Sequence, residues 1–165
     1  MTTKVLMTFI IFGSVVASAV TIAAEEPHPP QHQVELSPGL LTLLKAEMRE
    51  LSTGVQSVAL APATADWKAI QDISSKMQAS YIMEKKLTSA QTKELAQALP
   101  AHFKQLDAEF HQRAARLRAA ASTYDPELVA FHYSRLVESC ALCHAAYARS
   151  RFPGFAPPVQ QGHHH

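Results

Sequence analysis

Apolar residues in the central part of the chain recur at alternating spacings of three and four, as they do on one face of an α-helix. The first run covers about residues 38–60, and Ala61-Pro62 ends it. Its apolar positions are Leu41, Leu44, Met48, Leu51, Val55 and Val58. The pattern predicts an amphipathic helix that directs these side chains toward a core.

A second helix is predicted to begin near Thr64 or Asp66, since both are favoured N-cap residues. Its apolar positions are Trp67, Ile70, Ile73, Met77 and Tyr81. Around Leu87 the chain is expected to turn. Thr88 with Gln91 resembles a capping box, which predicts a short helix that reaches Leu99.

Pro100 lacks a backbone N–H, so it is expected to open or kink a third helix. That helix carries Phe103, Leu106, Phe110, Leu117 and Ala121 on one face. Asp125-Pro126-Glu127 predicts the start of a fourth helix, with a cap, a proline at the first position and an acid in the first turn. Its stripe consists of Val129, Tyr133, Leu136, Cys140, Cys143 and Tyr147, and Pro153-Gly154 ends it.

Four amphipathic helices with short connections and no strands predict an all-α protein, an antiparallel four-helix bundle over residues 37–152. Residues 25–36 are Pro-rich and predicted to be a flexible leader, in which His28 and His32 are interpreted as exposed side chains. Residues 153–165 form a tail whose three final histidines resemble a tag remnant.

The first 24 residues have the order of a secretory signal peptide: Lys4, an apolar run over residues 5–16, and a small-residue exit. Ala17-Ser18-Ala19 fits the cleavage rule, and cleavage after Ala23 or Ala24 fits as well. The alternative is a membrane anchor, but the apolar run is shorter than the roughly 20 residues that a span requires. We therefore expect export to the periplasm and no membrane insertion of the mature chain.

The charges are nearly balanced, with 15 Lys and Arg against 14 Asp and Glu, so composition gives no indication of a nucleic-acid partner. No serine–histidine–acid set, paired carboxylates or Gly-rich phosphate loop stands out in the sequence. These observations favour a protein that is not an enzyme.

The stretch ESCALCHAAY, residues 138–147, contains both cysteines of the chain. At i, i+3 and i+4 of one helix, Cys140, Cys143 and His144 project from nearly the same face. C-x-x-C-H is the attachment signal for c-type haem. The two thiols add across the two vinyl groups of the porphyrin, and the adjacent imidazole reaches the iron as proximal ligand.

Three other interpretations explain the cysteines less well. A disulfide between residues three apart closes almost no loop and so stabilises little. A zinc site lacks a second cysteine pair to complete four ligands. A thioredoxin-like redox pair belongs to a β-α-β setting, and no strand is predicted here. The sequence therefore predicts one covalent haem c, with Cys140 and Cys143 as attachment sites and His144 as iron ligand.

A four-helix bundle with Cys140-Ala141-Leu142-Cys143-His144 on its last helix resembles the class II c-type cytochromes, the cytochrome c-prime family. The likeness covers about residues 36–149, and the C-terminal placement of the motif selects this class, because class I cytochromes carry the motif near the N-terminus. The resemblance implies a periplasmic bundle with haem packed between its helices.

Two positions depart from the family pattern. Leu44, with Lys45 beside it, stands where an arginine is usual, and Ala148, followed by Arg149, stands where a basic residue is common.

The family divides by the sixth iron position, which is open in its high-spin members and filled by a methionine of the first helix in its low-spin branch. Met48, in AEMRELSTGV, matches that branch in register. The resemblance thus implies Met48 as the second axial ligand, while a core methionine that fills a gap is the alternative. Met77 and Met83 are weaker candidates, as are His102, His111 and His132, which a helix more often exposes.

Two functions remain open from the sequence. One is a single-electron carrier for a redox partner protein, and the other is a five-coordinate haem protein that binds NO or CO. The arginines Arg113, Arg116 and Arg118 form a predicted basic patch for an acidic partner, although a solvated helix face is the default interpretation. The resemblance leaves a homodimer through the first two helices open.

Overall fold

The computed structural model describes residues 34–155, except for the side chains of Glu84 and Lys85. The predicted signal peptide (residues 1–24), most of the predicted leader and the tail from residue 156 lie outside the described residues. The helices are α1 (Pro38–Leu60), η1 (Ala61–Thr64), α2 (Trp67–Gln78), α3 (Met83–Lys86), α4 (Ser89–Ala98), α5 (Ala101–Ala121), α6 (Pro126–Tyr147) and η2 (Pro153–Phe155).

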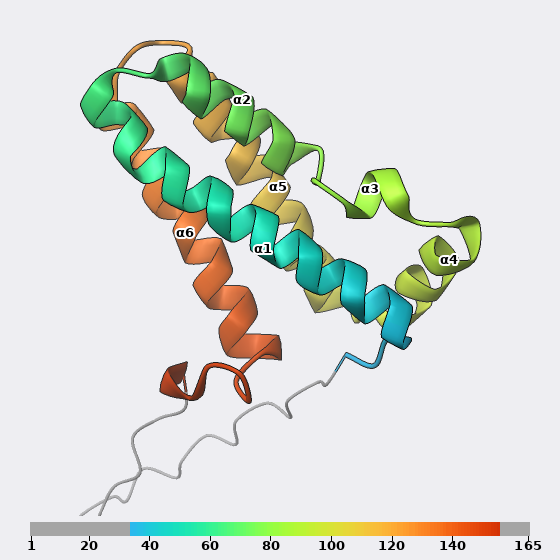
Figure 1. Cartoon of the computed structure of the whole chain (residues 1–165). Helices are drawn as coiled ribbons and strands as arrows, with labels where there is room; N and C mark the ends of the chain where they lie inside the picture. Colours follow the sequence, from blue (N-terminus) through green and yellow to red (C-terminus); the bar gives the residue numbers. More distant parts are fainter. Residues whose placement is uncertain (1–33, 156–165) are drawn as a thin grey trace, which may run out of the picture. The chain divides into compact units, whose positions relative to one another are not determined.

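The described residues form helices and no strands, which confirms the all-α prediction. The four helices α1, α2, α5 and α6 run alternately in opposite directions (Figure 1). Helix α5 packs most extensively on α2 and α6, whereas α1 contacts α2 and α6 less extensively. The result is the predicted antiparallel four-helix bundle, with α3 and α4 in the connection between its second and third members.

Local capping chemistry sets the starts of three of these helices where the sequence predicted them. The carboxylate of Asp66 accepts the backbone N–H of Ala69 at 3.0 Å, and Asp125 caps α6 in the same way. Thr88 and Gln91 form the predicted capping box at the start of α4. Because caps are contacts between near neighbours, the chain sequence alone determines them.

The second helix is shorter than predicted. Helix α2 ends at Gln78, so Tyr81 lies outside it, and the prediction that Tyr81 continues its apolar stripe is wrong. Ser80 has a φ of 54°, a left-handed backbone conformation that an α-helix cannot contain. The chain therefore turns there and forms α3, which the sequence did not predict.

The core occupies one half of the bundle. Its fully buried side chains come from all four long helices and include Val58, Ile70, Met77, Leu117, Val129 and Leu136. Gly54 brings α1 close to α2, because a Cβ at this position would lie 2.7 Å from both Met77 Cε and Tyr81 Oη. The stripe predicted for the last helix agrees with this core at Val129 and Leu136.

Helix α1 buries only part of the stripe that its periodicity predicted: Val58 is fully buried, and Leu51 and Val55 pack against the core. Its buried residues are Leu40, Glu47, Gly54 and Val58. Leu41 is 37% exposed and Met48 is 42% exposed, so the prediction that these two side chains face a core of side chains is wrong. The helix is rotated so that the neighbouring stripe, which includes a carboxylate and a glycine, meets α2 and the chain after it.

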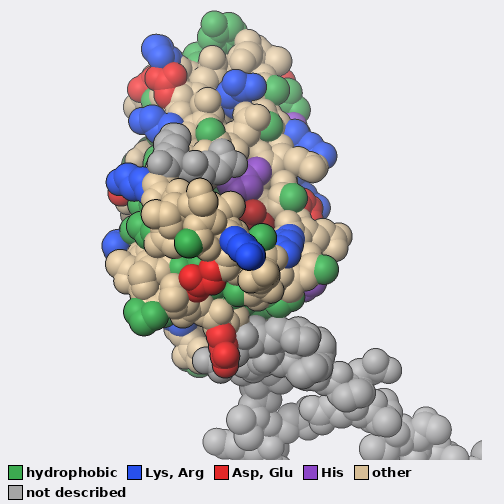
Figure 2. Space-filling view, turned by 90° about the vertical axis from the view of Figure 1, so that its right-hand side faces the viewer, with side chains coloured by type: hydrophobic (Ala, Val, Ile, Leu, Met, Phe, Trp, Pro, Cys, Tyr) green, Lys and Arg blue, Asp and Glu red, His purple; other side chains and the backbone are tan. Residues whose placement is uncertain are grey.

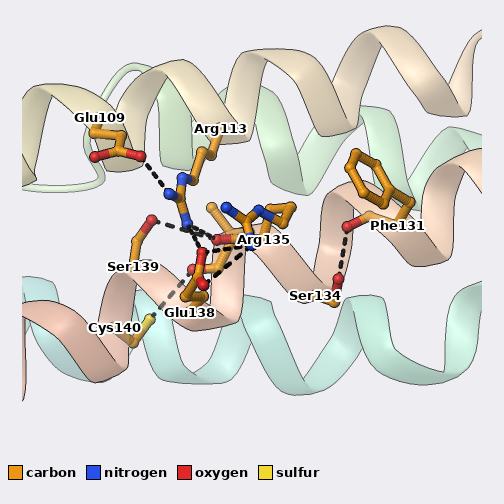
Figure 3. A network of polar contacts seen from close by, with 9 residues as sticks. Glu109, Arg113, Phe131, Ser134, Arg135, Glu138, Ser139 and Cys140 are labelled. Atoms are coloured by element: carbon orange, nitrogen blue, oxygen red, sulfur yellow. Dashed lines mark hydrogen bonds and ion pairs between the residues drawn. The ribbon is translucent and has the colours of Figure 1, made fainter.

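Arg113 is not part of a surface patch, contrary to the sequence prediction. Its side chain is 8% exposed and lies between α5 and α6 (Figure 3). The guanidinium donates to Glu138 at 2.8 Å, and also to Glu109 and to the backbone oxygen of Arg135. These acceptors take up hydrogen bonds from the guanidinium N–H groups, so the positive charge of Arg113 is paired within the interface between α5 and α6.

Arg116 and Arg118 remain exposed on α5. On the face shown in Figure 2, basic and acidic side chains are interspersed with hydrophobic ones. Within residues 34–155, no helix has both the length and the apolarity to cross a membrane.

Candidate haem-attachment site

The C-x-x-C-H motif lies in the last two turns of α6. Both thiols are half-buried and free, so they are not joined in a disulfide. The Cys140 thiol donates a weak hydrogen bond to the backbone oxygen of Leu136, 3.9 Å away (Figure 3). The helix is continuous through His144, which places the two sulfur atoms and the imidazole on one face as the spacing predicted.

The surroundings keep both thiols protonated at neutral pH. Burial raises the pKa of the Cys143 thiol to about 11, and the negative charges of Asp107 and Cys140 add to the effect. Burial also raises the pKa of Cys140. Two neutral thiols on one apolar helix face are compatible with thioether attachment and unlike the ionised thiolates of a redox or metal site.

The imidazole of His144 stacks on the ring of Phe152, with centroids 4.5 Å apart and an interplanar angle of 18°. A turn after α6 presents Phe152, whose N–H donates to the backbone oxygens of Ala148 and Arg149 at 3.0 and 3.1 Å. Burial, with the nearby positive charge of Arg151, lowers the pKa of His144. The ring is therefore neutral at pH 7, the form that ligates a metal.

Sequence reasoning did not identify Phe152. The residue lies eight positions after His144, and only the turn between them brings the two rings together. Phe152 directly precedes Pro153-Gly154, which signals the end of the helix, but this position gave no indication of a contact with His144. Two arginines, Arg149 and Arg151, follow the end of α6. Arg149 donates from Nε to the backbone oxygen of Ala145, and Arg151 lies 5.9 Å from the Phe152 ring.

The first turns of α5 add aromatic side chains beside the motif. The Tyr147 ring lies 5.1 Å from that of Phe103 and 5.9 Å from that of His102. His102 Nδ1 is also 3.2 Å from the Tyr147 hydroxyl. Phe103 and Tyr147 are half-buried, so an apolar aromatic wall flanks the last turn of α6.

Met48 lies on the N-terminal half of α1, which the antiparallel order places at the same end of the bundle as the motif. Toward this end the ribbons of α1 and α6 diverge (Figure 1). No described hydrogen bond or ring contact joins Met48 to Cys140, Cys143 or His144. The structure thus brings the predicted proximal residues together on α6 and presents Met48 separately, on another helix.

The weaker candidates for an iron ligand have other surroundings. Met77 is fully buried in the core, and its backbone oxygen is 2.8 Å from His111 Nδ1. His111 Nε2 also lies 3.6 Å from the carboxylate of Asp107. Met83 is half-buried and is the first residue of α3. These contacts favour structural roles for Met77 and His111.

The donor set fits haem c. Two free thiols and a neutral imidazole share one helix face, and aromatic and aliphatic side chains surround them. The hollows that the surface forms along α2 are lined instead by polar side chains such as Asp72, Lys76 and Gln71, and they include no residue of the motif. The chemistry of the motif, rather than the depth of a pocket, therefore identifies the site.

Comparison with protein families gives a match to the family described as Cytochrome C', over residues 33–148. No curated protein and no solved structure in the comparisons matches the chain. Proteins of this family carry a covalently attached haem c with iron, act in electron transfer or gas binding, and are typically periplasmic and generally not enzymes. Because the match spans most of the chain and includes the motif, the protein belongs to the cytochrome c' family, the class II c-type cytochromes.

Proposed function

We propose that this protein is a periplasmic single-electron carrier in which Cys140 and Cys143 attach the haem and His144 and Met48 bind its iron. The observation that carries the proposal is that two helix faces with suitable ligands lie at the same end of the bundle. One face, on α6, offers the thiols and a neutral imidazole. The other, on α1, offers an accessible thioether within an apolar stripe.

When bound, haem c supplies the one-electron couple between ferrous and ferric iron. The chain has three tasks around that group. The thiols of Cys140 and Cys143 would hold it covalently, His144 would offer its imidazole to the iron, and apolar side chains of α1 and α5 would limit contact with water. A dry, rigid environment lowers the reorganisation that accompanies a change of charge.

Met48 differs from a methionine that fills the core. Met77 is completely enclosed by protein, whereas 42% of Met48 is exposed to solvent. A partly exposed methionine contributes less packing than an enclosed one, which weakens the interpretation of Met48 as a gap-filling residue. As a soft axial ligand it stabilises ferrous iron and favours electron transfer over gas binding.

Gas binding is the second candidate function. Leu41 and Leu44 share the stripe of Met48, and α1 diverges from α6 at this end of the bundle. If Met48 stays away from the iron, these side chains form an apolar distal face of the kind that admits NO or CO. The same residues then serve a five-coordinate haem protein.

The absorption spectrum of the haem-loaded protein distinguishes the two functions. Methionine ligation makes the ferric protein low-spin, with a weak far-red sulfur-to-iron band. Met48→Ala should then abolish that band, give high-spin iron, lower the reduction potential and allow CO to bind rapidly. Met83→Leu is the matched control and should leave the spectrum unchanged. A wild-type spectrum that is already high-spin, and unaffected by Met48→Ala, contradicts electron transfer and supports gas binding.

The proposal includes export by the predicted signal peptide and a redox partner protein in the periplasm. The exposed Arg116 and Arg118 are the remainder of the predicted basic patch and could contact an acidic partner surface. Raising the ionic strength should slow electron exchange with such a partner, and Arg116→Gln with Arg118→Gln should reduce that salt dependence. A homodimer stays a prediction, which sedimentation of the haem-loaded protein tests.

A further inference from the structure

Glu47 is a buried carboxylate next to Met48 in the sequence. Only 3% of the residue is exposed, which is unusual for glutamate. Its two oxygen atoms accept three backbone N–H groups, from Tyr81 at 2.9 Å, Ile82 at 2.5 Å and Met83 at 3.2 Å. A buried charge is tolerated when hydrogen bonds of this kind replace water.

The three donors lie where the chain passes from α2 into α3: Tyr81 and Ile82 join the two helices, and Met83 is the first residue of α3. The left-handed backbone at Ser80 turns this segment, and the Ser80 hydroxyl accepts the N–H of Met83 at 3.1 Å. The N–H groups therefore converge on one carboxylate. Three hydrogen bonds to a single side chain fix both the rotation of α1 about its axis and its position along that axis.

Little else holds the N-terminal half of α1 in place. Leu40 is the other residue of this half that is buried. At the helix start, the backbone N–H and hydroxyl of Ser37 donate to the carboxylate of Glu94 at 2.7 and 3.0 Å. In the other half, by contrast, Gly54 and Val58 pack directly on the core.

We propose that Glu47 is a positioning residue, whose three hydrogen bonds set where α1 presents Met48 to the haem. The inference rests on the proposed function in one respect, since it assigns α1 to the distal side of the haem. Adjacent residues of a helix move as one rigid unit. A loss of the Glu47 anchor therefore changes the position of Met48 and the cover that α1 gives to that side.

The experiment compares Glu47→Ala, Glu47→Gln and Glu50→Gln in the haem-loaded protein. Glutamine keeps one acceptor oxygen, whereas alanine leaves the N–H groups of Tyr81 and Ile82 without their acceptor and leaves that of Met83 with the Ser80 hydroxyl alone. Burial raises the pKa of Tyr81, and the negative charges of Glu50 and Glu47 add to it. Glu50 thus lies within electrostatic reach of the same segment but is exposed, so Glu50→Gln removes a nearby charge and no described hydrogen bond.

The measurements are the low-spin fraction of the ferric protein and the CO association rate of the ferrous protein. Glu47→Ala should lower the low-spin fraction and raise the CO rate about tenfold, the factor that 1.4 kcal/mol represents. Glu47→Gln should be intermediate, and Glu50→Gln should match the wild type. A Glu47→Ala protein that is less stable but has unchanged spectrum and CO rate overturns the inference, because a merely structural role predicts that result.

Two further outcomes are also decisive. If Glu47→Ala yields no haem-loaded protein, Glu47→Gln decides alone: a CO rate above that of Glu50→Gln supports the inference, and equal rates overturn it. If the wild type proves five-coordinate, ligation by Met48 fails. The Glu47→Ala rate should still rise, because α1 covers the distal side, and an unchanged rate then overturns the positioning role as well.

Discussion

The two ends of this bundle use the same four helices differently. At the end where α1 runs into η1 and α6 begins, side chains such as Val58, Leu117 and Leu136 are fully buried. At the other end, α6 contains no fully buried residue after Ser139 among those described, and Leu41 and Met48 of α1 are exposed. The first end packs protein against protein, and the second presents apolar and ligating side chains.

In each long helix, therefore, one end contributes mainly to the stability of the fold and the other to the haem site. Packed side chains at the first end supply the free energy of folding, because burial of apolar surface dominates that free energy. The second end, with the attachment motif, depends on polar anchors such as Glu47 and on haem c. The helices are continuous, so the packed end orients the residues of the haem end.

Loss of the haem should have the largest effect and should affect one end more than the other. The double variant Cys140→Ser, Cys143→Ser removes both thioether bonds, so intact-mass measurement should show a chain without covalent haem. Hydrogen exchange should then accelerate in residues 38–49 and 140–152, where few side chains are buried. It should change little in residues 114–121.

A uniform rise in exchange across all four helices would contradict this division. It would mean that the haem stabilises the packed end as much as its own surroundings. Phe131→Leu is a suitable control, because that side chain is 58% exposed and lies on α6 outside the motif. Its haem content and exchange pattern should match those of the wild type.

Truncating a buried side chain of the packed core should lower the free energy of unfolding without altering haem attachment. Leu136 is fully buried, so Leu136→Ala should lower the free energy of unfolding by about 2–5 kcal/mol. Leu142→Ala, on the same helix, removes a side chain that is 45% exposed and should change it by less than about 0.5 kcal/mol. Urea unfolding measures both values. If Leu142→Ala lowered the free energy of unfolding more than Leu136→Ala, the assignment of stability to the packed end would be contradicted.

Arg113 connects α5 to α6 near the boundary between the two ends. Arg113→Met keeps the aliphatic bulk but removes the hydrogen bonds to Glu109, to Glu138 and to the backbone oxygen of Arg135. Glu138 retains its contact with the Arg135 side chain at 3.1 Å. Because the Glu138 side chain is 40% exposed, water replaces part of the interaction, and we expect a loss of about 1–2 kcal/mol. Arg116→Met, at an exposed position of the same helix, is the control for urea unfolding and should be nearly neutral.

The sequence predicted the parts of this structure that depend on near neighbours. The apolar spacing and caps such as Asp66 gave the long helices, and C-x-x-C-H placed its thiols and imidazole on one face. The buried face of α1 was predicted only in part: Val58 is buried as predicted, whereas Leu41 and Met48 are exposed. Leu40, Glu47 and Gly54, which repeat every seven positions, are buried as well. A glutamate and a glycine in that repeat carry no hydrophobic signal.

The remaining differences come from contacts between distant residues. Arg113 resembled a surface cation until the carboxylate of Glu138, on another helix, proved to be its partner. Glu47 is buried because backbone donors 34 to 36 positions away surround its carboxylate. Neither partnership follows from helix periodicity, since periodicity describes one helix at a time.

The smallest expected effect concerns the proximal side of the haem end. Phe152 stacks on His144, and an aromatic contact of this kind is worth about 0.5–1.5 kcal/mol. Phe152→Leu removes the ring, so protons should compete more easily with iron for His144. The midpoint of acid-induced loss of the proximal ligand should therefore rise, by at most about one pH unit, since one unit corresponds to 1.36 kcal/mol. Phe155→Leu, which alters a ring 6.5 Å from Phe152, should leave the midpoint in place. Equal midpoints for Phe152→Leu and the wild type would show that the α6 helix alone holds the imidazole.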